Sequence, residues 1–152
     1  MDLLNTKWKV HFSSNRMGIR LIGPRPKWKR LDGGEGGSHP SNIHDCGHAL
    51  GSINFTGDMP IILTVEGPTQ GGFVCPFTII SSDFWKIGQL KSGDTIIFKP
   101  IIINQALKHK KLINHYLNYI KKLLDYSSLN IPKPKHFNNI NNLLLYNHYY
   151  SY

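Results

Sequence analysis

Glycine and proline recur every few residues through the first hundred positions, and this spacing allows only short elements joined by tight turns. Short apolar runs lie between these turn residues, as in an all-β domain, and most of the runs are rich in β-branched side chains. Trp8, Val10 and Phe12 alternate with other residues, as they would on one face of a half-buried strand. The predicted strands are 7–13, 18–22, 49–55, 60–65, 74–81 and 95–99.

The pattern changes to helical spacing in two places. A short turn of helix is predicted where Ser81 or Ser82 can act as a cap. After Pro100, Asn104 can cap a longer helix that has one apolar stripe and lysines on its other faces. We therefore predict a mainly β unit at 1–100, an amphipathic helix at 101–128, and a low-complexity, poorly ordered tail at 129–152.

The net charge of +9 raises the question of a nucleic-acid partner. Residues 1–100 hold 11 Lys and Arg against 8 Asp and Glu, a net of +3, whereas residues 101–152 hold 7 Lys against Asp125 alone, a net of +6. Two thirds of the excess therefore lies after residue 100 and not in the strand-rich unit, so nucleic acid is not an expected partner.

Three features of the sequence predict a cytoplasmic location. No apolar run approaches the roughly 18 residues that cross a bilayer. The first residues show no signal-peptide pattern. Cys46 and Cys75 are far apart in the sequence, so no disulfide framework is expected and a reducing compartment is the default.

The segment 32–45 is the densest in glycine and polar side chains, with Glu35, His39 and Asn42 able to accept or donate hydrogen bonds. From the residues alone, it is either a mobile surface loop or a loop that orients a small polar substrate. Zinc is not predicted, because Cys46 is only two residues from each neighbouring histidine and has no Cys-x-x-Cys partner. The segment also lacks the pattern of a P-loop.

Two further turns are candidates for a site. Asp58 lies at the tip of a tight turn between apolar strands, where its carboxylate either satisfies turn amides or accepts a hydrogen bond from an N–H substrate. Gly71 and Gly72 belong to a third glycine-rich turn, which by composition is either a hairpin connection or a place of close approach to a ligand. Trp28, like the other tryptophans, is expected to pack in the core or at its rim.

The combination of these segments resembles one known family, which contains one subunit of 5-oxoprolinase and one half of the urea carboxylase carboxyltransferase domain. Residues 14–21, Ser-Asn-Arg-Met-Gly-Ile-Arg-Leu, resemble its Asn/Asp-Arg-Met-Gly-x-Arg-Leu motif. The segments similar to the urea carboxylase version are 32–42, 54–60 and 71–76, and residues 85–90 and 93–94 end the module in the family manner. In fungi and algae, urea carboxylase can be fused to an allophanate hydrolase, and the fused enzyme is called urea amidolyase.

The resemblance implies a cyclophilin-like β-barrel, of which this chain would hold only part. It also implies an ATP-dependent, biotin-dependent ligase reaction in which carboxybiotin gives its carboxyl group to urea, forming allophanate. Placed on the matching motifs, the expected catalytic residues are Asp58, His39 and Glu35. Asn42 and Asp58 would bind urea, and Gly71 and Gly72 would let biotin pass closely.

The same resemblance implies partners outside this chain. The companion carboxyltransferase subdomain, the biotin carboxylase that uses ATP and Mg, and the biotin carrier are not recognised in it, so activity of the chain alone is not expected. Two alternatives remain open: a 5-oxoprolinase-subunit-like module of an ATP-dependent amide hydrolase, and a noncatalytic interaction protein that uses its basic helix. No membrane partner is expected.

Overall fold

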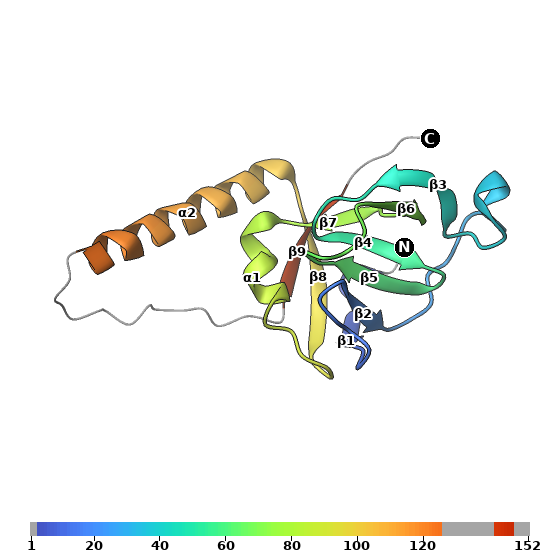
Figure 1. Ribbon diagram of the computed structural model, residues 1–152, viewed down its shortest axis with the longest axis horizontal. Coiled ribbons are helices and arrows are strands. Elements are labelled where there is room, and N and C mark those ends of the chain that lie inside the picture. The colour runs from blue at the N-terminus through green and yellow to red at the C-terminus, as the bar shows by residue number, and fades with distance from the viewer. Residues whose placement is uncertain (1–2, 126–141, 148–152) are drawn as a thin grey trace.

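Seven strands form a closed barrel in the computed structural model, which describes residues 3–125 and 142–147 (Figure 1). Six of them run antiparallel in the order β8, β1, β2, β5, β4, β7. The seventh, β9, lies between β7 and β8 and pairs in parallel with β8. The strand bounds are Lys7–Val10 (β1), Gly18–Ile22 (β2), Ser52–Thr56 (β4), Met59–Leu63 (β5), Phe77–Ile79 (β7), Thr95–Ile101 (β8) and Asn142–Asn147 (β9).

A two-stranded ribbon lies beside the barrel and is made of β3 (Asn42–Gly47) and β6 (Gln70–Phe73). The 3-10 turn η1 (Gly34–Gly36) precedes this ribbon, and η2 (Ser81–Asp83) leads directly into the short helix α1 (Phe84–Ile87). The long helix α2 (Ile103–Asp125) follows β8 and extends away from the barrel (Figure 1). Within the described residues, no helix combines the length and apolar character that a membrane crossing requires.

The barrel interior holds the hydrophobic core, and the strand pattern explains why. Lys7 and Lys9 are exposed while Trp8 and Val10 are buried, because successive side chains of a strand point to opposite faces. The largest fully buried side chains include Phe55 and Phe98, and the other members of the core cluster are Leu3, Trp8, Val10, Ile19, Leu21, Ile53, Ile62, Phe77, Ile79, Ile87 and Ile96. This core confirms the predicted mainly β fold.

Phe12 is an exception to the predicted alternation, since its side chain is 80% exposed. Strand β1 ends at Val10, two residues before it. The backbone N–H of Ser14 then donates to the carbonyl oxygen of His11 (3.1 Å), so the chain turns before Phe12 can reach the core. The prediction that Phe12 shares the buried face with Trp8 is therefore wrong.

The predicted helix caps also differ from the structure. Ile80 precedes η2 and no side chain caps that turn, so neither Ser81 nor Ser82 plays the predicted role. Asn104 lies inside α2 and not before it, and the Oε1 atom of Gln105 accepts from the backbone N–H of Ile102 (3.2 Å). The side-chain amide of Gln105 thus takes the capping role that was predicted for Asn104.

The six predicted strands correspond to β1, β2, β4, β5, β7 and β8, and the predicted long helix corresponds to α2. The sequence did not predict β3, β6 or β9. Strand β9 falls in the range 129–152 that was predicted as a low-complexity tail, and the remainder of that range lies outside the described residues.

Candidate functional site

Asp58 lies at the tip of the hairpin that joins β4 to β5. Thr56 pairs with Met59 across this turn, and Gly57 has a φ angle of 65°, which a residue with a side chain adopts only at a cost. The turn holds the Asp58 carboxylate beyond the ends of β4 and β5, with its side chain 35% exposed. The predicted position of Asp58 on a tight turn between two strands is thus confirmed by the structure.

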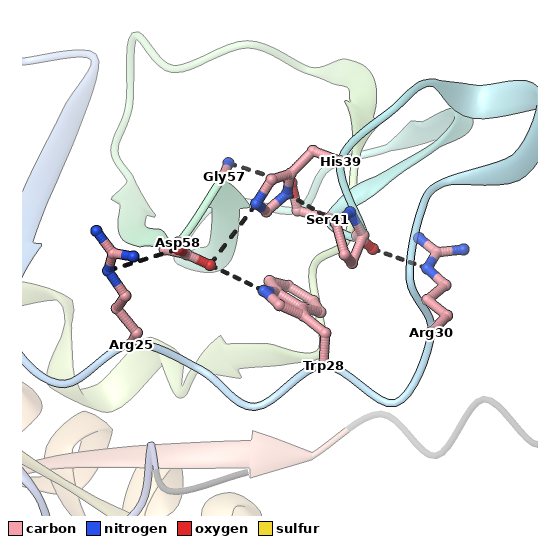
Figure 2. A network of polar contacts seen from close by, with 8 residues as sticks. Arg25, Trp28, Arg30, His39, Ser41, Gly57 and Asp58 are labelled. Atoms are coloured by element: carbon pink, nitrogen blue, oxygen red, sulfur yellow. Dashed lines mark hydrogen bonds and ion pairs between the residues drawn. The ribbon is translucent and has the colours of Figure 1, made fainter.

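Three nitrogen groups from one preceding loop face this carboxylate (Figure 2). The indole Nε1–H of Trp28 donates to Oδ1 of Asp58 at 2.9 Å. Nε2 of His39 lies 3.7 Å from the same oxygen, and Nε of Arg25 lies 3.9 Å from Oδ2. Residues far apart in the sequence are therefore brought to one polar cluster, which we call the Asp58 cluster: Arg25, Trp28, His39, Ser41, Gly57 and Asp58.

Ser41 connects His39 to the turn that carries Asp58. The backbone N–H of Ser41 donates to Nδ1 of His39 at 3.0 Å, and the Ser41 hydroxyl lies 2.9 Å from the same nitrogen. The backbone N–H of Gly57 donates to Oγ of Ser41 at 3.1 Å. Ser41 is fully buried, so its groups are shielded from water, and these contacts hold the imidazole against the hairpin.

The indole of Trp28 connects the cluster to the barrel core. Its ring meets Phe55 edge to face with the centroids 5.8 Å apart, and it meets His39 in the same arrangement at the same distance. Phe55 is buried in the core, so the loop that carries Trp28 rests on a close-packed part of the molecule. Trp28 was predicted to pack at the core or its rim, and it does so while also donating to Asp58.

Glu35, predicted to be catalytic, lies outside the Asp58 cluster. It belongs to η1, and its Oε2 atom faces Nε2 of His44 at 3.5 Å. The side chains of Glu35 and His44 are 91% and 78% exposed, so water screens their interaction strongly. A role for Glu35 in catalysis gains no support from this position and stays a prediction.

Asn42, predicted to bind urea, is the first residue of β3 and pairs with Phe73 of β6. A Cβ atom on Gly37 would collide with the amide group of Asn42, and Gly37 has a φ angle of 136°. The backbone oxygen of Asn42 accepts from the guanidinium of Arg30. The contacts of Asn42 that the structure shows are therefore with its own loop and with the ribbon.

Gly71 and Gly72, predicted to contact biotin, lie in β6 and face the neighbouring strand. A Cβ atom on Gly72 would lie 3.0 Å from the backbone oxygen of Ile43, and one on Gly71 would lie 3.0 Å from Cε1 of His48. A side chain at position 72 would press on the backbone of β3, whereas one at position 71 would press only on the imidazole of His48. Close packing against β3 accounts for the glycine at 72, and the predicted contact of both glycines with biotin stays a prediction.

A separate cavity of about 500 Å³ opens beside α1 and does not include any predicted site residue. The apolar part of its lining includes Val10, Ile19, Leu63, Phe84 and Ile87. The Arg16 guanidinium and the Glu66 carboxylate form an ion pair and also belong to the lining. The two groups neutralise each other, so this pair offers no isolated charge to recognise a ligand.

The Cys75 thiol is held in its unreactive, protonated form. Burial is the main cause that raises the pKa of Cys75 to about 12, and the neighbouring Cys46 raises it further, while a hydrogen bond with Asn54 acts in the opposite direction. Cys46 and Cys75 are both free thiols. In the part of the chain that the structure describes, no three His, Cys, Asp or Glu residues lie together as metal ligands would.

The Cys75 thiol is expected to react slowly with iodoacetamide at pH 8, because the thiolate is the reactive form. Between an ordinary pKa of 9.0 and one of about 12, the thiolate fraction falls by about 1000-fold. Alkylation followed by mass spectrometry in a Cys46→Ser variant should therefore show a rate at least about 100-fold below that of the urea-unfolded chain. Similar rates in the folded and unfolded protein would show that Cys75 is not protected.

The sequence missed three members of the Asp58 cluster: Arg25, Trp28 and Ser41. Trp28 and Asp58 are 30 positions apart, and neither residue shows a pattern that relates it to the other. Ser41 was only one of several polar residues in a glycine-rich loop. Its complete burial, which no composition reveals, marks it as a structural link.

Comparison with known proteins gives a consistent result. Residues 1–100 match the family described as carboxyltransferase domain, subdomain A and B. A urea amidolyase of Saccharomyces cerevisiae is 57% identical over 100 residues, which are 66% of this chain and 5% of that protein. The crystal structure of the Kluyveromyces lactis urea amidolyase superposes with a TM-score of 0.69 and 52% identity, covering 75% of this chain and 7% of that one.

A more distant relative is a 5-oxoprolinase subunit of Haemophilus influenzae, which is 26% identical over 120 residues, or 78% of this chain and 36% of that protein. The chain thus spans only 5% and 7% of the length of the two amidolyases.

Proposed function

We propose a function from one premise: the chain belongs to the family of carboxyltransferase domains, subdomain A and B. Within that family we infer that it corresponds to the urea-type module, on which a carboxyl group passes from carboxybiotin to a urea nitrogen to give allophanate. The identity of 57% to a urea amidolyase, against 26% to a 5-oxoprolinase subunit, supports the urea-type assignment over the alternative.

The observation that carries this proposal is the Asp58 carboxylate, held at the tip of the β4–β5 hairpin with Trp28 and His39 at Oδ1 and Arg25 at Oδ2. Urea is a weak nucleophile whose N–H groups must be oriented while nitrogen meets the carboxyl carbon. A fixed carboxylate can accept a hydrogen bond from one of these N–H groups and so hold the nitrogen toward the carboxyl carbon. Trp28 and His39 both face Oδ1, whereas Oδ2 faces the guanidinium of the exposed Arg25 at 3.9 Å, so we propose that urea replaces Arg25 at this second oxygen.

Biotin, carried by another domain, would supply the reactive carboxyl group, and ATP with Mg would be used in the biotin carboxylase. The residues of this chain would orient urea and keep it close to the arriving ring. Because the chain spans 5% and 7% of the two amidolyases, the activity is proposed for the complete enzyme, in which a companion subdomain completes the site. The chain alone is proposed to be inactive.

The experiment that tests this function is a graft. Residues 7–100 of this chain replace the matching segment of a complete urea carboxylase, and urea-dependent ATP hydrolysis is measured together with allophanate formation. Activity within about tenfold of the parent enzyme would support the proposal, because the catalytic contacts of the segment would then be intact. Loss of allophanate formation in a graft that is folded and still carboxylates biotin would contradict it.

A second candidate function follows from α2, which extends from the barrel with an apolar stripe flanked by lysines. Leu107, Leu117 and Leu124 of this stripe are 51%, 49% and 62% exposed, so the described residues leave part of the stripe uncovered. A basic helix of this kind can bind an acidic partner or nucleic acid in a noncatalytic role. The lysines that such a partner would contact are Lys108, Lys110, Lys111, Lys121 and Lys122.

If α2 binds DNA with all five lysines on phosphates, the logarithm of the binding constant should fall with log salt concentration with a slope of about −4 to −5. Fluorescence anisotropy with the full chain and a labelled duplex between about 50 and 200 mM salt measures this slope. Replacing Lys110, Lys111 and Lys121 with glutamine should reduce the slope by about three. No detectable binding at the lowest salt concentration would remove the nucleic-acid role.

A further inference from the structure

We infer that His39 is a positioning residue whose ring proton lies on Nε2 and points to Asp58, so that Oδ2 of Asp58 is the oxygen that accepts the substrate N–H. This inference rests on the proposed function for its catalytic meaning, although the position of the proton does not. It narrows the sequence-based expectation that His39 is catalytic, because a positioning residue acts through Asp58 and not on the substrate itself.

The first step concerns Nδ1 of His39. The backbone N–H of Ser41 can act only as a donor, and it donates to Nδ1 at 3.0 Å. Nδ1 must therefore present its lone pair and cannot carry a hydrogen. A hydrogen on Nδ1 would face the Ser41 N–H directly and would leave that donor without this partner, which is costly in a fully buried residue.

The Ser41 hydroxyl can satisfy this tautomer as well. Its oxygen already accepts from the backbone N–H of Gly57 at 3.1 Å, and it lies 2.9 Å from Nδ1 of His39. The hydroxyl hydrogen can thus point at the ring nitrogen, while the oxygen serves the Asp58 turn. In this tautomer the backbone N–H and the hydroxyl of Ser41 share the single lone pair of Nδ1.

The second step concerns Nε2. A neutral imidazole carries one N–H, and with Nδ1 unprotonated that hydrogen lies on Nε2. Nε2 lies 3.7 Å from Oδ1 of Asp58, so the ring directs a donor at the carboxylate (Figure 2). In this tautomer neither ring nitrogen has a lone pair available to remove a proton from a substrate, which is what a general base requires.

The third step concerns the two oxygens of Asp58. Oδ1 receives the Trp28 indole N–H at 2.9 Å and faces the His39 N–H. Oδ2 faces only the Arg25 guanidinium among the ion pairs of the described residues, at 3.9 Å, and the Arg25 side chain is 89% exposed. An exposed arginine moves aside readily, so Oδ2 is the oxygen open to a urea N–H. Trp28 is then a second positioning residue.

The proton position is tested by NMR on the full chain labelled with 15N-histidine. Long-range 1H–15N correlation distinguishes a protonated from an unprotonated ring nitrogen, and a His39→Gln variant identifies which of the 8 histidine signals belongs to His39. We expect an unprotonated Nδ1 and a protonated Nε2. The same pattern is expected in Ser41→Ala, which keeps the backbone donor. A protonated Nδ1 in the unaltered chain would overturn the inference.

The catalytic meaning is tested in the complete enzyme with the grafted segment. Glutamine at position 39 can still donate an N–H but cannot act as a base, so His39→Gln should keep turnover within about tenfold, whereas loss of a general base costs about 100-fold to 10,000-fold. Trp28→Phe removes the indole N–H that donates to Oδ1 of Asp58. This variant should raise KM for urea more than it lowers kcat. A loss of about 100-fold or more in kcat for His39→Gln would overturn the positioning role.

These outcomes separate the two proposals. If the graft makes no allophanate although it folds, the proposed function fails, and the NMR measurement still decides the proton position. If the graft is active and Nδ1 is protonated, the function stands and the inference about His39 fails.

Discussion

Replacing Asp58 with alanine is expected to lower urea-dependent turnover of the complete, grafted enzyme by at least about 100-fold. The carboxylate is the one acidic group in the Asp58 cluster, and its Oδ2 is the proposed acceptor for a urea N–H. Without it, the urea nitrogen loses the group that is proposed to orient it. The measurement is allophanate formation at saturating carboxybiotin supply, with KM and kcat determined separately.

Two variants make this result interpretable. Asp58→Asn keeps the shape but offers an amide in place of a carboxylate, so it should lose nearly as much activity as the alanine variant. Asp94→Ala removes another turn aspartate, which is distant from the cluster in sequence and whose Oδ2 accepts from the backbone N–H of Lys91 at 3.0 Å. This variant should leave turnover nearly unchanged. Full activity in Asp58→Ala would remove Asp58 from the mechanism.

The Phe55→Ala variant of the isolated chain is expected to lose about 3 to 5 kcal/mol of its free energy of unfolding. Phe55 is 1% exposed, fills the barrel interior and supports the Trp28 indole edge to face. Its removal leaves a cavity in the core and also loosens the loop that contributes to the Asp58 cluster. Chemical denaturation in guanidinium chloride, followed by far-UV circular dichroism, measures the change.

Phe12 provides the matched control because it is the same residue type just beyond the end of another barrel strand, with 80% of its side chain exposed. Phe12→Ala should change the free energy of unfolding by no more than about 0.5 kcal/mol. Equal effects of the two substitutions would mean that Phe55 is not part of a close-packed core in solution.

The sequence predicted the barrel strands well where one face is buried and the other is not. Lys7 to Val10 alternates cleanly, because Trp8 and Val10 enter the core while the lysines stay in water. The prediction failed where neither face has that contrast. In β6, glycines at 71 and 72 give no apolar alternation, and the strand exists because β3 lies against it.

The site was predicted in part, for a related reason. Asp58 and His39 lie in segments whose residue types suggest polar chemistry, and the structure brings the two side chains together. Glu35 belongs to the same loop as His39 by sequence, yet η1 directs it toward His44. Which members of a glycine-rich loop converge depends on contacts such as Trp28 on Phe55, and these exist only in three dimensions.

The way the barrel closes has a consequence for handling this protein. Strand β9 occupies the gap between β7 and β8, and it bonds to both neighbours, in opposite senses. A chain truncated after α2 would lack β9 and would leave backbone N–H and C=O groups of β7 and β8 unpaired. Such unpaired edges attract other chains, so a shortened product would be prone to associate edge to edge and to precipitate.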